Sequence, residues 1–439
     1  MTPATISNGG MSDIELVGSG IQCLKTASRF SARLKNRRII FHHRTLLVDV
    51  VCIPFHDLKI AQSEGFRTRD SHLYYHFSRN KEVSRTIIIN RPTLFGEVLL
   101  KRKSTTPLGE TIYKKNGITI TKITNKLFCI DVLDFSFLGP LLNGKGYISH
   151  LYTKNSKKII TGLKHLGVTD FVSYESSPLT FNLCSILSPK FRIFDGVDNL
   201  CKHPTYSKIK DDLELTYQKI INTYNSIYFN STDSVNYFNA SNIKNVTFLP
   251  NGVDFERFQA VTEEPESLRH IPRPVIVYAG KMQELLDVEL IKEASNKFKS
   301  CTFLLLGKVL KKGIKEDLSI CENVIFGGDI KYDDLPSYIC NSDICFIPYN
   351  IEKQHGGDPI KFYEYMAANK PIVSTKIGEI SKYHNGKDIF VCSRSEFINS
   401  LEEALSFNKN IFNNLPTEFT WEYKADQMLK RAHNEKHIF

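Results

Sequence analysis

The chain has 439 residues, 41% of them hydrophobic and 24% charged, with 10 cysteines and a formal net charge of +10. This composition excludes a disordered chain, and the length suits two or three folded domains. No apolar run of about 18 residues predicts a membrane-spanning helix. The cysteines show no Cys-x-x-Cys spacing. Neither a zinc site nor a disulfide framework is therefore expected, and reduced thiols in a cytoplasmic protein are the simpler prediction.

The positive charge suits an anionic membrane or a phosphorylated substrate. No segment resembles a nucleic-acid-binding module, so nucleic acid is not an expected partner. Residues 1–44 are predicted to be an extension, and residues 25–44 contain Lys and Arg but no acidic residue. Two interpretations stay open. Residues 21–44 form either a helix on an anionic membrane, which would hold the protein peripherally at its inner face, or a disordered basic extension.

The first domain is predicted over residues 45–258. Short apolar runs alternate there with helical patterns, which is typical of strands buried on both faces of a parallel sheet. Strands are expected over residues 46–52, 86–90, 127–131, 170–174, 192–195 and 226–229, and a helix over residues 211–223. The alternation predicts a doubly wound α/β domain.

A polar segment with three prolines, residues 259–274, is a predicted linker. The alternation restarts in a second α/β domain over residues 275–415. Strands are expected over residues 275–278, 302–306, 323–326, 344–347, 372–374 and 389–391, and helices over residues 286–298, 335–341 and 360–368. A final helix is predicted to begin at Trp421, within residues 416–439.

The most informative segment is residues 356–374, a glycine pair followed by a helix, a turn and a buried strand. Asp358 is the predicted N-cap, Pro359 suits the first helical position, and Asn369 can end the helix in the left-handed conformation. The free amides of a helix start attract anions. Lys361 adds positive charge nearby, and Glu364 can accept hydrogen bonds from hydroxyls. These groups suit a sugar nucleotide.

This segment closely resembles the donor-site motif of GT-B glycosyltransferases of the family-4 type (glycosyl transferases group 1). In that motif a Pro-x-Lys-x-x-Glu-Tyr-x-Ala helix precedes a Pro-x-Val strand. Further matches follow the family order: Phe194-Asp195-Gly196-Val197-Asp198, His203-Pro204, Asn230-Ser231, Leu249-Pro250-Asn251-Gly252-Val253-Asp254 and Val277-Tyr278-Ala279-Gly280-Lys281.

The resemblance implies two Rossmann-like domains facing a central cleft, with the acceptor on the first domain and the nucleotide sugar on the second. It also implies that the final helix returns to the first domain. Catalytic roles are implied for Lys281 and Lys361, which would neutralise the diphosphate. Asp198 forms a carboxylate pair with Asp195 at a strand end, which suits acid/base chemistry, and it is the better candidate for binding acceptor hydroxyls. No metal or other cofactor is expected. The implied donor-binding residues are Gly280, Gly356, Gly357, Asp358, Pro359, Ile360 and Glu364.

The chain departs from the commoner family pattern at two positions. Leu286 stands where many relatives have a second lysine, and Gly356 stands where many have a first glutamate. The first departure removes a positive charge from the diphosphate site. The second removes a contact to the transferred sugar.

A loop after the first strand carries a second group of candidates. Gly65, Arg67 and Arg69 could bind a donor phosphate or a phosphorylated acceptor, because guanidinium groups match phosphate oxygens. The alternative is that Arg69 and Asp70 form local structural pairs and cap the next helix. Asp195, at the end of another strand, could take part in acid/base chemistry or cap a turn.

The function indicated is transfer of a hexose from a nucleotide diphosphate sugar to a saccharide or lipid-linked acceptor. The resemblance implies retention of anomeric configuration and a place in surface polysaccharide or glycoconjugate biosynthesis. Two alternatives stay open, a non-catalytic sugar-nucleotide-binding subunit and a GT-B sugar-nucleotide epimerase.

Overall fold

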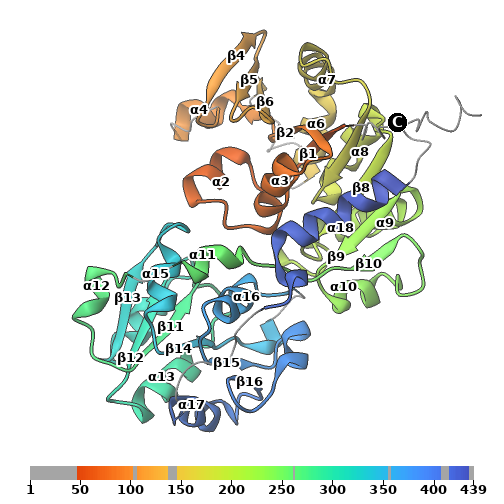
Figure 1. Ribbon diagram of the computed structural model, residues 1–439. Helices are drawn as coiled ribbons and strands as arrows, with labels where there is room; N and C mark the ends of the chain where they lie inside the picture. The colour runs from red at the N-terminus through yellow and green to blue at the C-terminus, as the bar shows by residue number, and fades with distance from the viewer. Residues whose placement is uncertain are drawn as a thin grey trace, which may run out of the picture. The chain divides into compact units, whose positions relative to one another are not determined.

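A computed structural model describes residues 47–439, except 102–105, 137–145, 261–262, 354–356, 407–414 and 435–439. Leu47–Phe439 form one compact unit, shown in Figure 1. The basic helix considered for residues 21–44 and the donor-site residue Gly356 lie outside the described residues. Among the described residues, no helix combines the length and apolar character needed to cross a membrane.

The first domain is built on one large sheet with the strand order β10-β9-β8-β7-β1-β2-β6-β5-β4, and β3 pairs with β6. The strands are β1 (Val48–Ile53), β2 (Val83–Ile89), β3 (Thr93–Leu94), β4 (Glu110–Lys115), β5 (Ile118–Lys122), β6 (Leu127–Asp134), β7 (Phe171–Glu175), β8 (Phe191–Gly196), β9 (Ser226–Phe229) and β10 (Val246–Phe248). All pairs from β10 to β6 are parallel.

One edge of this sheet differs from the doubly wound prediction, because β4 and β5 pair in the antiparallel sense and β5 pairs with β6 in the same sense. Asn116 and Gly117 form the two-residue turn between β4 and β5, both with positive φ (53° and 74°). An Asn-Gly pair favours this turn because both positions need the left-handed region.

Helices cover both faces of the first sheet. They are α2 (Leu58–Glu64), α3 (Arg69–Arg79), α4 (Phe95–Lys101), α6 (Tyr147–Lys154), α7 (Ser156–His165), α8 (Phe181–Leu187), α9 (Lys210–Thr223), α10 (Thr232–Tyr237), with α18 (Trp421–Asn434) from the far end of the chain. Successive residues of β1 point to opposite faces. Val50 therefore packs in the core cluster that contains α3 and α18, and Val51 packs in the cluster that contains α7 and α8.

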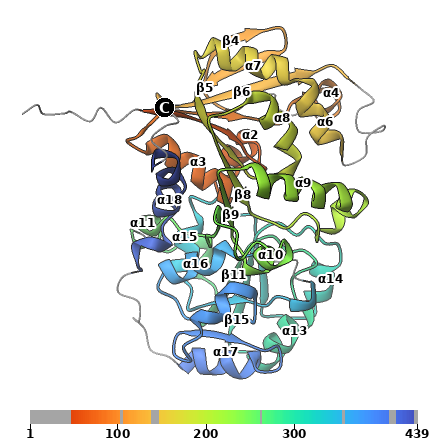
Figure 2. The ribbon, with the colours of Figure 1, turned by 90° about the vertical axis from the view of Figure 1, so that its right-hand side faces the viewer.

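The final helix, α18, belongs to the core of the first domain. Its Trp421 and Met428 are fully buried in the same cluster as Tyr74 and Phe77 of α3. Both ribbon views show α18 beside α3 (Figures 1 and 2).

The second domain has a wholly parallel sheet with the order β13-β12-β11-β14-β15-β16. This is the 3-2-1-4-5-6 order of nucleotide-binding doubly wound folds. Its strands are β11 (Val275–Ala279), β12 (Thr302–Leu306), β13 (Val324–Gly328), β14 (Ile344–Ile347), β15 (Ile372–Thr375) and β16 (Ile389–Cys392). Its helices are α11 (Phe255–Gln259), α12 (Glu266–Arg269), α13 (Val288–Lys297), α14 (Ile314–Leu318), α15 (Leu335–Cys340), α16 (Ile360–Ala367) and α17 (Phe397–Ser406).

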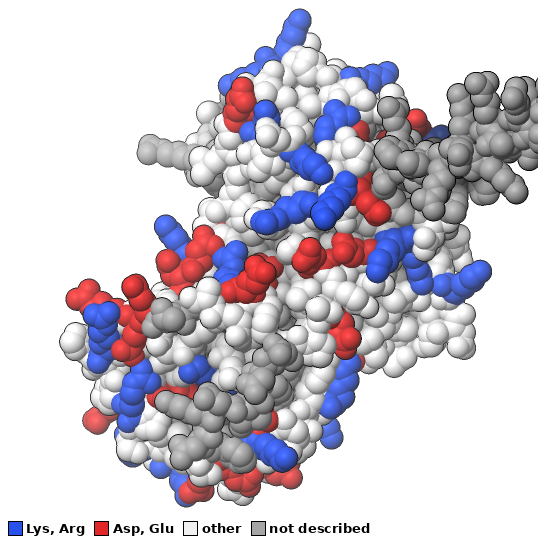
Figure 3. Space-filling view, in the orientation of Figure 1, with Lys and Arg blue, Asp and Glu red and all other residues white. Residues whose placement is uncertain are grey.

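Charged side chains of both signs are interspersed on the face shown in Figure 3. The formal charge of +10 therefore does not gather there into one basic stripe, which is the surface feature expected of a nucleic-acid-binding protein.

Candidate active site

A cavity of about 1130 Å³ lies at the carboxyl ends of strands from both sheets. Open parallel sheets bind ligands at that edge, because the connecting loops and helix starts converge there. The first domain contributes the segments after β1, β7, β8 and β9, and the second domain contributes those after β11 to β14 and the start of α16. The cavity is also lined by most of the residues predicted for donor and acceptor binding.

Gly280 and Lys361 meet on the second-domain wall. Gly280 has a φ of 155°, and a Cβ there would lie 2.8 Å from Lys361 Cε and 3.0 Å from its Nζ. A side chain would therefore displace the lysine. Lys361 Nζ donates to the Tyr349 hydroxyl at 2.5 Å and lies 5.3 Å from the Tyr278 ring centroid. Aromatic faces stabilise an ammonium group at this distance, so the charge is held in place beside the glycine turn.

Lys281 follows directly and is exposed on the cavity wall. Its Nζ has no hydrogen-bond or ion-pair partner among the residues that the structure describes, whereas its backbone carbonyl accepts a hydrogen bond from the Tyr278 hydroxyl. Leu286, at the position of the usual second lysine, is 4% exposed and packs in the core. Lys353 also lines the cavity. It was not singled out from the sequence, and it lies on the same wall as the two predicted lysines.

The start of α16 corrects one prediction. Pro359 rather than Asp358 is the N-cap residue, and no side chain caps the helix. Asp358 Oδ2 instead accepts hydrogen bonds from the Asn251 backbone N–H and the Tyr363 hydroxyl, each at 2.7 Å. Burial raises the pKa of Asp358 to about 6. Asp358 thus links the donor loop to the first domain, which the local sequence pattern could not show. The predicted left-handed Asn369 is confirmed by its φ of 56°.

The remaining donor-site candidates, Gly357, Pro359 and Ile360, lie along the segment that leads into α16. A Cβ at Gly357 would lie 3.8 Å from Asp198 Oδ1, so the glycine loop faces Asp198 across the cavity. Pro359 and Ile360 line the cavity, and Ile360 also packs against the first-domain core.

Glu364 lines the cavity although its side chain is only 5% exposed. Burial raises its pKa to about 7, and the Asp254 carboxylate acts in the same direction, while Tyr332 and Lys361 favour the charged form. Burial deprives this carboxylate of hydrogen bonds from water, and hydroxyls of a ligand could supply them instead.

Arg67 and Gly65 take part in contacts between the two domains. Arg67 Nε lies 2.8 Å from Glu64 and its Nη1 lies 3.1 Å from Asp329. Gly65 ends α2 with a φ of 79°, and a Cβ there would lie 2.8 Å from Tyr332 Cβ. The charge of Arg67 is therefore already paired with carboxylates, and Gly65 allows the two domains to approach closely.

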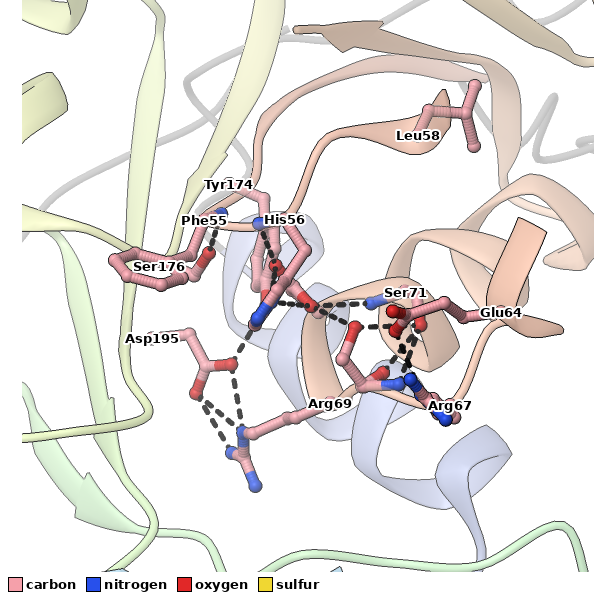
Figure 4. Close-up of polar contacts among 12 residues, drawn as sticks. Phe55, His56, Leu58, Glu64, Arg67, Arg69, Ser71, Tyr174, Ser176 and Asp195 are labelled. Carbon is pink, nitrogen blue, oxygen red and sulfur yellow. Dashed lines mark hydrogen bonds and ion pairs between the residues drawn. The ribbon is translucent and has the colours of Figure 1, made fainter. Parts of the chain in front are cut away.

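Arg69 is held in a buried ion pair, which favours the structural alternative over the predicted contact with a phosphate. The side chain is 1% exposed. Its Nε and Nη2 contact Asp195 at 2.9 Å (Figure 4). Its Nη1 donates to Asn251 at 3.0 Å. Asp195 also accepts from the Tyr174 hydroxyl at 2.8 Å and is 0% exposed. Asp195 is therefore a buried ion-pair partner, and the pair spans distant parts of the chain rather than a local turn.

Asp198 is accessible from the cavity and stands directly after β8. Burial in the cavity raises its pKa, His56 and His203 oppose this change, and Asp70 adds to it. Its position near Gly357 suits the predicted contact with acceptor hydroxyls.

Comparison with known proteins adds independent information. Residues 273–406 match the family description "Glycosyl transferases group 1". A curated relative, described as a teichuronic acid biosynthesis glycosyltransferase (TuaH) of Bacillus subtilis (strain 168), is 28% identical over 208 residues. That alignment covers 43% of this chain, and it spans about half (51%) of the relative's length.

Solved structures share the fold over most of the chain, at 12% identity in each case. Sucrose-phosphate synthase from Thermosynechococcus elongatus has a TM-score of 0.60 and covers 89% of this chain and 96% of its own. Starch synthase IV from Arabidopsis thaliana, bound to ADP and acarbose, has a TM-score of 0.59 with 89% and 99% covered. Anabaena HepE, in complex with UDP and glucose, has a TM-score of 0.55 with 89% and 98% covered. The predicted GT-B fold of two Rossmann-like domains is thus confirmed.

The second domain contributes one wall of the cavity, and the opposite wall holds residues that sequence reasoning did not assign. Phe55, His56 and Ser176 line it, from the segments after β1 and β7. His56 lies in the loop after β1 that also carries Arg67 and Arg69, and a histidine shortly after a buried strand was the available signal. Among the described residues no group of three or more His, Cys, Asp or Glu side chains is placed to hold a metal ion.

Proposed function

We propose that the protein transfers a hexose from a nucleoside diphosphate sugar to a saccharide or lipid-linked acceptor. The observation that carries the proposal is the joint placement of Lys281, Lys361 and Glu364 in one cavity at the carboxyl ends of both sheets. Two ammonium groups suit the diphosphate, and a buried carboxylate suits ribose hydroxyls. The UDP and ADP named with two of the similar structures support this class of donor.

In the proposed reaction, the bond between the sugar C1 and the diphosphate oxygen breaks while the acceptor oxygen bonds to C1. Negative charge grows on the leaving diphosphate, where Lys281 and Lys361 stabilise it. The acceptor proton leaves with the diphosphate. Attack on the face of C1 from which the diphosphate departs would retain the anomeric configuration, as the family-4 resemblance implies. The lysines supply the positive field, so we propose that activity does not need a divalent metal.

We place the reaction in surface polysaccharide or glycoconjugate synthesis, which the description of the curated relative supports. A cytoplasmic location, with peripheral contact to the inner face of an anionic membrane through residues 1–44, is part of the same proposal.

The first experiment is a thermal-shift screen of the purified protein against UDP-, GDP-, ADP- and dTDP-sugars. A donor at 100 times its dissociation constant should stabilise the protein by about 2.7 kcal/mol. Transfer is then measured with that donor, with and without EDTA, and NMR of the product gives the anomeric configuration. Conversion of the donor without an acceptor would favour the epimerase, and donor binding without conversion would favour the non-catalytic subunit.

A further inference from the structure

A histidine–aspartate pair stands on the first-domain wall of the cavity. His56 Nδ1 lies 3.2 Å from Asp70 Oδ1 and 3.3 Å from Oδ2. A carboxylate only accepts hydrogen bonds, so Nδ1 carries a proton and Nε2 keeps its lone pair when the ring is neutral. Nε2 makes no hydrogen bond to any residue within the described ranges. The ring is 34% exposed and lines the cavity.

Asp70 is fixed by further contacts, which fix the ring in turn. The carboxylate is 2% exposed. It accepts hydrogen bonds from the His56 backbone N–H at 2.9 Å, the Thr68 hydroxyl at 2.6 Å and the Ser71 backbone N–H at 3.0 Å. Figure 4 shows His56 and Phe55 on the loop after β1, with Ser71 near the start of α3. The histidine is therefore pre-oriented before any ligand binds.

The groups around His56 suit a sugar. The Phe55 ring is 41% exposed and meets the His56 ring edge to face, with centroids 5.1 Å apart. His203 Nδ1 accepts from the Thr205 backbone N–H at 3.1 Å, so its Nε2 carries the proton and can donate. With the carboxylate of Asp198, this wall offers hydrogen-bond acceptors, the His203 donor and an apolar ring face.

The same wall is unsuited to a phosphate. Arg67 is paired with Glu64 and Asp329, and Arg69 is paired with Asp195. Each arginine that lines the described part of the cavity therefore already has a carboxylate partner. A phosphorylated acceptor would also approach the negative charge of Asp198, which is unfavourable in a partly desolvated site.

We propose that His56 and Asp198 form hydrogen bonds with hydroxyls of an uncharged sugar at the acceptor end, beside the reacting hydroxyl, and that Phe55 packs against its C–H face. This inference rests on the proposed function and specifies its acceptor. The acceptor terminus is a neutral sugar rather than a sugar phosphate. Asp70 is a positioning residue, since it acts through His56.

The first test compares matched acceptors in the presence of saturating UDP. Methyl glucoside, methyl galactoside and methyl N-acetylglucosaminide are compared with glucose, galactose and N-acetylglucosamine 6-phosphates, by saturation-transfer NMR. We expect signals from at least one neutral glycoside and none from the phosphates. An equal response of the two classes, or a preference for phosphates, overturns the proposal. UDP binding measured by calorimetry in the same samples reports the donor site separately, so failure of the proposed function would be recognised by its loss.

The second test substitutes His56. In His56→Phe, affinity for the responding glycoside should fall about tenfold, with UDP affinity within about twofold of wild type. His56→Gln keeps an acceptor atom and should recover part of the loss. His150→Phe provides the matched control, because His150 is exposed on α6 and does not line the cavity. Unchanged glycoside binding in His56→Phe, or equal losses in His56→Phe and His150→Phe, would show that His56 does not bind the acceptor.

Discussion

Replacing Glu364 by Gln links the stability of the protein to its donor site. Glu364 is 5% exposed, and burial raises its pKa from the ordinary value of 4.5 to about 7. Ionisation therefore costs more in the folded protein than in the unfolded chain. Gln has a similar shape but no charge, so the substitution removes this cost together with the charged hydrogen-bond acceptor.

The sign and size follow from the two pKa values. A folded-state pKa above the unfolded value means that Glu364 contributes stability that is fully present below about pH 4.5 and is lost as the pH rises through about 7. The two values, 4.5 and about 7, differ by an amount that corresponds to about 3 kcal/mol. Relative to Glu364→Gln, the wild type should therefore lose about 3 kcal/mol in free energy of unfolding between pH 4 and pH 9.

Nucleotide binding should reverse the effect. Ribose hydroxyls that donate to the carboxylate favour its charged form, so binding near pH 7 should release about half a proton per site. The charged hydrogen bonds are worth about 1.5–3 kcal/mol, and Glu364→Gln should weaken nucleotide affinity about ten- to a hundredfold.

Urea unfolding at pH 4, 5.5, 7 and 8.5 measures the first effect, and UDP calorimetry in buffers of different ionisation enthalpy measures proton release. Glu322→Gln, an exposed glutamate of the second domain outside the cavity, controls for the chemical change. A stability difference between wild type and Glu364→Gln that does not change with pH would refute the argument from burial. Equal proton release and equal UDP affinity in both proteins would remove Glu364 from the donor site.

Three further outcomes are expected. Lys281→Ala should lower turnover at saturating donor about a hundred- to a thousandfold, because Leu286 cannot replace the charge, and wild-type turnover would exclude Lys281 from stabilising the leaving group. Arg69→Met should destabilise the fold by about 3–5 kcal/mol, because it leaves Asp195 buried and unpaired. Adding Asp195→Asn to this variant should partly restore the urea midpoint, and no recovery would contradict a structural pair. Deleting residues 1–44 should abolish sedimentation with anionic liposomes at low salt without changing UDP affinity, whereas equal sedimentation would favour a plain basic extension.

The sequence predicted most of the parallel sheet because buried strands are short, apolar and separated by helices. The expected strands over residues 226–229, 302–306 and 344–347 coincide with β9, β12 and β14. The antiparallel β4 was missed because its residues are largely exposed and carry no apolar run. The Asn116-Gly117 turn was the signal that could have identified that hairpin.

The candidate site was predicted well where its chemistry is local in sequence. Gly280 and Lys361, 81 positions apart by their numbers, were each found from their own motif, and the structure brings them into contact. The cap predicted at Asp358 was wrong and the Arg69 pair with Asp195 was not foreseen, because the partners, Asn251 and Asp195, are distant in sequence. Local patterns give a cap or an exposed cation, and only the folded chain shows which groups become buried together.

The position of α18 has a consequence for how the protein is made. The first domain needs Trp421 and Met428 to complete its core, yet these residues are synthesised after the whole second domain. During translation the apolar face of α3, including Tyr74 and Phe77, therefore has no partner helix until the second domain has been synthesised. Exposed apolar surface of this kind favours aggregation in partly folded chains. Truncation before Trp421 should leave that face permanently uncovered, so the two domains cannot be separated by cutting the chain between β10 and β11.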